Sequence, residues 1–168
     1  MSKLMRDLAL AGVALSMAIG AAHAQAGGAF ELITASEAQR EARAEAAAPA
    51  EIITPRAAPP RSDATAIRVV SPTGAAGGGG VSAPVRIELA FKPAPGARIV
   101  PSTFRVLYGL LKIDLTDRMK KHATVSETGV VVDNAQVPDG QHRLILQVAD
   151  DQGNTAEQEL RIRVGAAS

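Results

Sequence analysis

The sequence predicts an all-β domain, a sandwich of seven or eight short antiparallel strands. Apolar and polar residues alternate with a period of two in several runs, most clearly over 85–91 (VRIELAF). Gly, Pro, Asn and Asp residues interrupt these runs at short intervals, as turns between strands require. From residue 66 onward no helical run is long enough to be the crossover connection of a parallel sheet.

The clearest hairpin signal is the C-terminal stretch 138–164. The alternating run 142–148 is followed by a polar turn, DDQGN, and then by a second alternating run. In the turn we expect Asp150 to accept hydrogen bonds from the backbone, and Gly153 and Asn154 to adopt positive φ. The stretch therefore predicts two neighbouring antiparallel strands.

Shorter runs predict the other strands. In 104–108 both faces carry apolar residues, which is typical of a central strand covered on both sides. Thr116 is expected to cap a single helical turn that ends at Lys121. The remaining predicted strands are 67–70, 85–91, 111–115, 123–126 and 129–133.

Three short motifs carry a family resemblance: DGxHxL at 139–144, DxxGN at 150–154 and PSTF at 101–104. They resemble the last hairpin and the start of the third strand of bacterial immunoglobulin-like domains, the fibronectin- and cadherin-like kind found in exported proteins. The resemblance implies an immunoglobulin-like sandwich over 66–165. The chain departs from the family in having no Cys pair and no Trp, and His142 stands where related sandwiches often carry a corner tyrosine. We expect this His to hydrogen-bond a loop carbonyl, as that tyrosine would.

Residues 1–24 predict a secretory signal peptide, with a basic start, an uncharged apolar run and a final Ala-His-Ala. An uncleaved N-terminal anchor is the alternative. We expect export to the periplasm of a Gram-negative bacterium, or secretion, and no membrane span after cleavage. The whole chain has 18 basic and 17 acidic residues; cleavage after residue 24 would remove Lys3, Arg6 and Asp7 and leave 16 of each. This balance, with 2% aromatic residues, argues against a nucleic-acid partner.

Residues 25–65 are expected to form a flexible tail. Thr34 and Glu37 fit a capping box and predict a helix over 35–47. Because alanines are its only apolar residues, the helix should be exposed and marginally stable on its own. A Pro- and Ala-rich linker follows the helix.

The turn residues Asp150, Asp151 and Asn154 are weak candidates for a calcium site, because hard cations bind carboxylate and amide oxygens. The turn supplies three such side chains, whereas a full site needs about six oxygens. Met119 and His122 form a single pair of copper-ligand types, and a copper site would need more of them. The sequence therefore predicts no cofactor.

Catalysis is not expected. The chain has no cysteine and no Gly-x-Ser-x-Gly motif, and its paired carboxylates fall in turns or at outward strand positions. We predict a non-catalytic envelope protein, an interaction or structural module whose partner is another envelope protein. The alternative is a periplasmic sandwich that binds a ligand, either a metal ion or a carbohydrate.

A possible docking surface follows from strand parity. Leu107 and Ile145 should point outward on neighbouring strands, where they would lie side by side. The predicted rim of this patch consists of Arg105, Arg143 and Arg161.

The sequence offers two candidates for the segment or protein that binds this patch. One is the apolar cluster Phe30, Leu32 and Ile33 of the tail, and the other is a partner protein. As an alternative, Met119 and the short helical turn would cover the patch within the domain.

Overall fold

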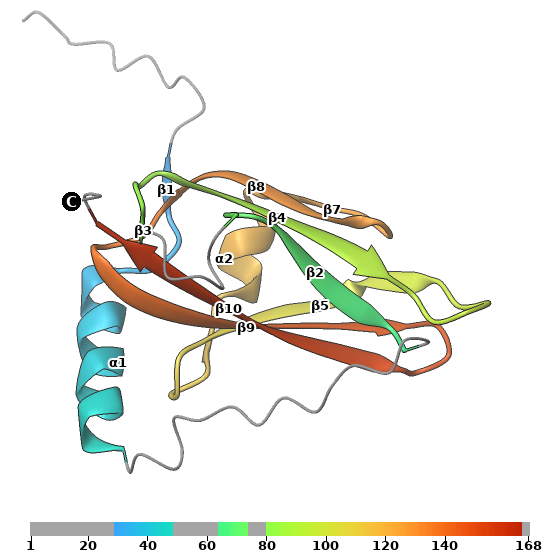
Figure 1. The fold of residues 1–168 in the computed structure, drawn as a ribbon, viewed down its shortest axis with the longest axis horizontal. Coiled ribbons are helices and arrows are strands. Elements are labelled where there is room, and N and C mark those ends of the chain that lie inside the picture. The colour runs from blue at the N-terminus through green and yellow to red at the C-terminus, as the bar shows by residue number, and fades with distance from the viewer. Residues whose placement is uncertain (1–28, 49–63, 74–79, 166–168) are drawn as a thin grey trace, which may run out of the picture.

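The computed structural model describes residues 29–48, 64–73 and 80–165. The predicted signal peptide and most of the predicted linker lie outside these ranges. Within them, two β-sheets pack face to face as a sandwich (Figure 1). The predicted all-β class and sandwich architecture are confirmed.

The described residues form ten strands and two helices, more strands than the seven or eight predicted. The extra strands are two-residue segments, too short to leave an alternation in the sequence. In chain order the elements are β1 (Phe30–Glu31), α1 (Ala35–Ala47), β2 (Ala66–Ser71), β3 (Gly80–Val81), β4 (Val85–Lys92), β5 (Ile99–Tyr108), β6 (Ile113–Asp114), α2 (Thr116–Lys120), β7 (Ala123–Val125), β8 (Gly129–Gln136), β9 (Gly140–Asp150) and β10 (Thr155–Val164).

The first sheet has the strand order β1-β8-β4-β2, with β7 also paired to β8. The second sheet has the order β3-β10-β9-β5-β6. The predicted C-terminal hairpin is β9–β10, which pairs without a register shift from Ala149 opposite Thr155 to Gly140 opposite Val164. Two short parallel pairs, β1–β8 and β3–β10, make both sheets mixed, whereas the other pairs are antiparallel as predicted.

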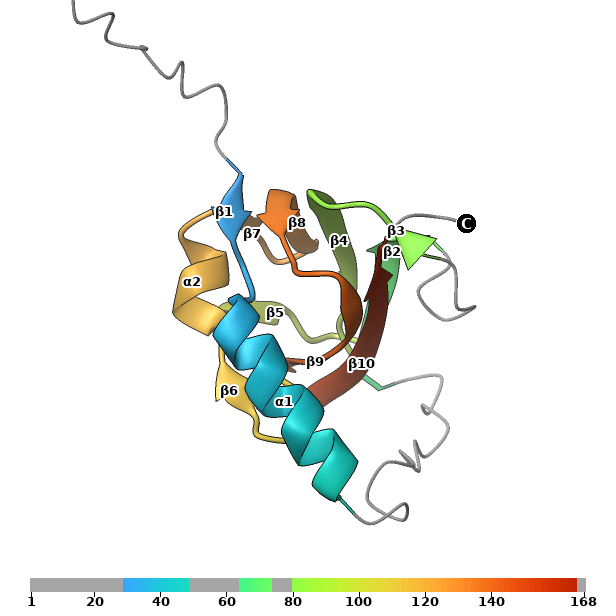
Figure 2. The same ribbon diagram turned by 90° about the vertical axis from the view of Figure 1, so that its left-hand side faces the viewer.

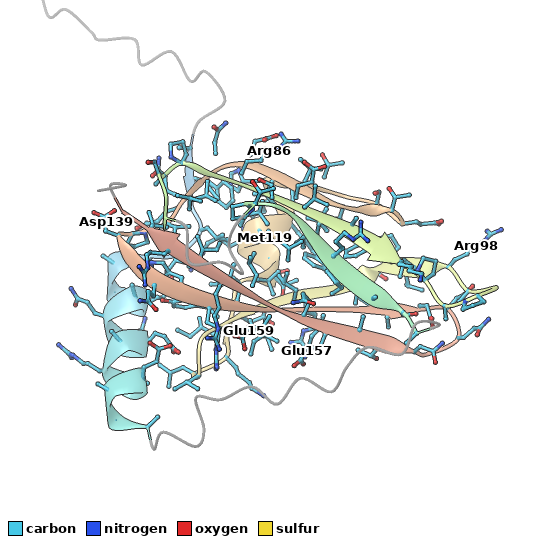
Figure 3. All side chains as sticks on the ribbon, viewed as in Figure 1. Arg86, Arg98, Met119, Asp139, Glu157 and Glu159 are labelled. Atoms are coloured by element: carbon cyan, nitrogen blue, oxygen red, sulfur yellow. The ribbon has the colours of Figure 1, made fainter. Side chains whose placement is uncertain are left out.

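Aliphatic side chains from the inward positions of both sheets fill the space between them, as the scarcity of aromatic residues requires. Phe104 and Val106 are fully buried, and the Phe91 ring lies 5.8 Å from that of Phe104, centroid to centroid. Met119 on α2 is also fully buried (Figure 3). Helix α2 closes one side of the sandwich between the two sheets (Figure 2).

The segment around α2 differs from the prediction in two details. The strand predicted over 111–115 is reduced to β6, because the chain turns sharply at Lys112, which has φ 49°. The helical turn is present, but Thr116 does not cap it. Its hydroxyl accepts instead a hydrogen bond from the buried Val106 N–H at 3.0 Å, which ties α2 to β5.

Candidate functional site

The turn between β9 and β10 is organised by the carboxylate of Asp150, which is buried. Its Oδ1 accepts hydrogen bonds from the backbone N–H groups of Gln152 at 3.0 Å and Asn154 at 2.8 Å. Its Oδ2 accepts from the Thr65 hydroxyl and, at 2.9 Å, from the Asn154 amide. Burial raises the pKa of Asp150, but these hydrogen bonds outweigh it and lower the pKa to about 2. The predicted role of Asp150 in the turn is thus confirmed.

The other calcium candidates are also used within the fold. Asp151 Oδ1 accepts a hydrogen bond from the Arg98 N–H at 2.9 Å. Gly153 has φ 83°, as predicted, but the expected positive φ of Asn154 is wrong. The Asn154 carbonyl instead accepts from the Asp150 N–H at 3.0 Å, so one left-handed residue is enough to reverse the chain. Among the described residues, no group of three or more His, Asp and Glu could hold a metal ion.

His142 occupies the corner position predicted for it and is buried. Its Nε2 lies 2.8 Å from the Pro138 carbonyl, which only accepts, so Nε2 carries the proton and donates. The Tyr108 hydroxyl then donates to Nδ1 at 3.0 Å. Burial lowers the pKa of His142, so the neutral imidazole that this arrangement requires is favoured. The predicted bond to a loop carbonyl is confirmed.

Met119 and His122, the one predicted pair of copper-ligand types, face different surroundings. Met119 is fully buried in the core. His122 is exposed, and its ring stacks on that of Phe30 with centroids 4.1 Å apart and planes 7° from parallel. The thioether and the imidazole therefore serve two separate apolar contacts.

Residues 29–48, which we call the arm, pack on the sandwich, so the prediction of a flexible tail is wrong for this part of the chain. Phe30 lies opposite Ala135 in the parallel pair β1–β8, and the Leu32 N–H donates to the Gln136 carbonyl at 2.9 Å. Leu32 and Ile33 are fully buried. Helix α1 then crosses one end of the sandwich (Figure 1). The physical reason is that the edge of β8 and the open end of the core offer partners that the isolated helix lacks.

The apolar cluster Phe30, Leu32 and Ile33 therefore docks at the edge of the first sheet and not on the predicted patch around Leu107 and Ile145. All three side chains belong to the buried core. In this conformation they are not available to a partner protein, which corrects their place among the candidate partner-binding residues.

An ion pair fixes the start of α1 to α2. The predicted capping box is confirmed: the Glu37 N–H donates to Thr34 Oγ1 at 3.2 Å, and the Thr34 N–H donates to Glu37 Oε2 at 2.9 Å. Arg118 donates to both Glu37 carboxylate oxygens, at 2.8 and 3.0 Å, and to the Leu32 carbonyl at 2.8 Å. The Arg118 hydrogen bonds outweigh burial and, with those from Thr34, lower the pKa of Glu37 to about 2.

This ion pair predicts acid sensitivity of the folded state. Because the folded pKa of Glu37 lies below its ordinary value of 4.5, its contribution is complete above pH 4.5 and is lost as the pH falls toward 2. We expect a loss of about 1–2 kcal/mol from this group, since the exposed side of Arg118 is screened by solvent. Urea unfolding at pH 7 and pH 2.5 measures it: Glu37→Gln should show a smaller pH difference than the unmodified chain. Equal pH differences in the two proteins would contradict the assignment, and Glu127→Gln, at an exposed turn, is the control.

Glu41, one helical turn after Glu37, has a role that the sequence did not predict. Its side chain is buried, and its carboxylate accepts hydrogen bonds from the backbone N–H groups of Leu110 and, at 3.2 Å, Leu111. These groups belong to the turn between β5 and β6. At Gly109, which has φ 68°, a Cβ would lie 1.9 Å from the Glu41 carboxyl carbon. Two features of the sequence could have indicated this contact: Gly109, which interrupts a strand, and the spacing of Glu37 and Glu41, which places both acids on one face of the helix.

Leu107 and Ile145 lie directly opposite one another in the β5–β9 ladder, as their parity predicts. Both are half-buried, and neither belongs to the core between the sheets, so they lie on the outer face of the second sheet. Met119 is inside that core, so it does not cover them. We call Leu107 and Ile145 the outer patch.

The guanidinium groups around the outer patch are paired with acids. Arg105 donates to Asp114 at 2.9 Å. Arg161 donates to Glu159, and Arg143 lies 3.9 Å from the same carboxylate. The three guanidinium groups share two carboxylates, so these pairs leave one net positive charge, and the patch offers a small apolar contact with a weakly charged rim.

No helix in the described ranges is both long enough and apolar enough to span a bilayer. The fold defines the chain as a two-sheet β-sandwich with an N-terminal arm. Neither a protein-family model nor a curated protein matches the chain. Among solved structures, CopC from Methylosinus trichosporium OB3b aligns with 52% of this chain and 83% of its own, at 15% identity and a TM-score of 0.35.

Proposed function

We propose that the protein is a non-catalytic, exported interaction module of the bacterial envelope, located in the periplasm, with an immunoglobulin-like sandwich as its scaffold. Its partner is another envelope protein, which docks on the outer patch. The observation that carries the proposal is the register pairing of Leu107 with Ile145 on an outer sheet face. The polar groups that could have suggested chemistry, such as Asp150 and His142, are used to hold turns and corners together.

The nature of the patch indicates how a partner would bind. Its rim charges are largely compensated within the chain, so long-range attraction contributes little and the apolar contact supplies the affinity. Apolar side chains at the centre of an interface, surrounded by polar groups, are typical of binding hot spots.

The test uses Leu107→Asp/Ile145→Asp in the full chain. Val70→Asp/Thr124→Asp, at exposed positions on the first sheet, is the matched control. Crosslinking in the periplasm identifies the captured proteins, and calorimetry with the purified partner measures affinity. We expect the patch variant to bind at least about tenfold more weakly, a loss of about 1.4 kcal/mol, and the control to bind normally. A folded patch variant that captures and binds the same protein with unchanged affinity would refute the proposal.

A further inference from the structure

β10 has an edge that the described part of the chain leaves largely open. On one side it pairs with β9 along its whole length. On the other side β3 pairs only with Arg163 and Val164, so no described strand is hydrogen-bonded to Thr155–Ile162, although β2 of the first sheet packs close to β10. A row of unpaired backbone groups of this length is a template for adding another strand.

The side chains of β10 alternate strictly between the two faces. The inward side chains Ala156, Leu160 and Ile162 are buried. After the uncharged Thr155, the outward side chains are all charged and change sign once: Glu157 and Glu159 are followed by Arg161 and Arg163. Figure 3 shows Glu157 and Glu159 on the outer side of the second sheet.

When two copies of β10 lie antiparallel, this order of charges places acidic side chains of one copy opposite basic side chains of the other. An antiparallel copy aligned on Leu160 brings Glu159 opposite the second copy's Arg161. Glu157 then approaches the end of the second copy's β10 that carries Arg163, where β3 already holds the ladder position. Moving the axis by one residue places two Glu159 or two Arg161 side chains directly opposite each other. Leu160 is therefore the axis position at which every outward pair is of opposite sign.

We propose that the β10 strands of two copies pair antiparallel about a two-fold axis at Leu160, which gives a homodimer with one continuous sheet. Residues 158–162 provide the backbone pairing in each copy before β3 is reached. Such an interface has the same patch on both subunits, as two-fold symmetry requires. The inference goes beyond the proposed function and does not rest on it, but the two surfaces adjoin, because Glu159 lies opposite Ile145 and Arg161 belongs to the rim of the outer patch.

The edge of β2 is a poorer site for a second copy. β2 is the last strand of the first sheet, but its register shifts between Val69 and Ser71, and Pro72 follows. A bulge and a proline both interrupt a ladder. Arg68 is the one charged side chain on β2, so the strand has no complementary pattern.

Sedimentation velocity on the full mature chain, from about 1 µM to about 1 mM, tests the dimer. We expect a concentration-dependent dimer that weakens as salt is added. The acidic variant Arg161→Glu/Arg163→Glu and the basic variant Glu157→Arg/Glu159→Arg should each raise the dissociation constant at least about tenfold, because like charges then face each other. An equimolar mixture of the two variants should dimerise again, since unlike charges meet across the mixed pair.

Arg68→Glu, on the edge of β2, is the matched control and should leave the dimer unchanged. Melting temperatures show whether each variant is folded. If the basic variant does not fold, Glu157→Arg alone, at an exposed position, replaces it in the mixture. A monomer at every concentration overturns the proposal. So does a dimer that ignores both variants, or a mixture that stays monomeric.

Discussion

Replacing Leu32 by alanine is expected to lower the free energy of unfolding by about 3 kcal/mol, within the range of about 2–5 kcal/mol found for buried leucines. Leu32 is fully buried among core residues, so the substitution leaves a cavity where the arm meets the sandwich. Chemical denaturation followed by circular dichroism measures the change.

Leu111→Ala is the control, because Leu111 is 51% exposed and its loss should change stability by no more than about 0.5 kcal/mol. If the two variants are equally stable, the arm does not pack as described. A large loss in Leu32→Ala alone shows that residues 29–48 are an integral part of the domain.

Gly109→Ala is expected to lower the free energy of unfolding by a similar amount, about 3–4 kcal/mol. Gly109 has φ 68°, a conformation that costs an L residue about 1–2 kcal/mol. The new Cβ would also lie 1.9 Å from the Glu41 carboxyl carbon. The carboxylate must then move, which leaves the N–H groups of Leu110 and Leu111 without their acceptor and costs about 1–3 kcal/mol more.

Gly153→Ala separates these two causes. Gly153 has φ 83°, but a Cβ there meets no atom within 4 Å, so only the backbone cost of about 1–2 kcal/mol applies. In the double variant Glu41→Ala/Gly109→Ala the new Cβ no longer collides with a carboxylate. The double variant should therefore lose less free energy of unfolding than the sum of the losses in the two single variants. Equal losses at the two glycines, or a strictly additive double variant, would show that Glu41 does not contact this turn.

The sandwich could be predicted because its signals are local. Alternation over 85–91 marks β4, and the DDQGN turn marks the β9–β10 hairpin. The roles of Asp150 and His142 were also predicted, because each bonds to groups a few residues away, as turn chemistry requires.

The contacts of the arm could not be predicted because they join distant residues. Glu37 meets Arg118 across 81 residues, and Glu41 meets Leu110 across 69. The side of α1 that packs on the sandwich is recognisable by these acids and not by a stripe of apolar residues, and hydrophobic periodicity is the main sequence signal for a docked helix. An exposed, marginal helix was the consistent reading of the local pattern. Its burial depends on partners that only the tertiary structure supplies.

The attachment of the arm has a consequence for the order of folding. The arm is the first described segment to be synthesised, but its binding site consists of α2, the end of β8 and the turn after β5, all of which come more than 60 residues later. Contacts of this separation are slow to form, because long loops must close first. We therefore expect the β9–β10 hairpin to form before the arm attaches. On this expectation the arm is the last described segment to be protected from proteolysis during folding.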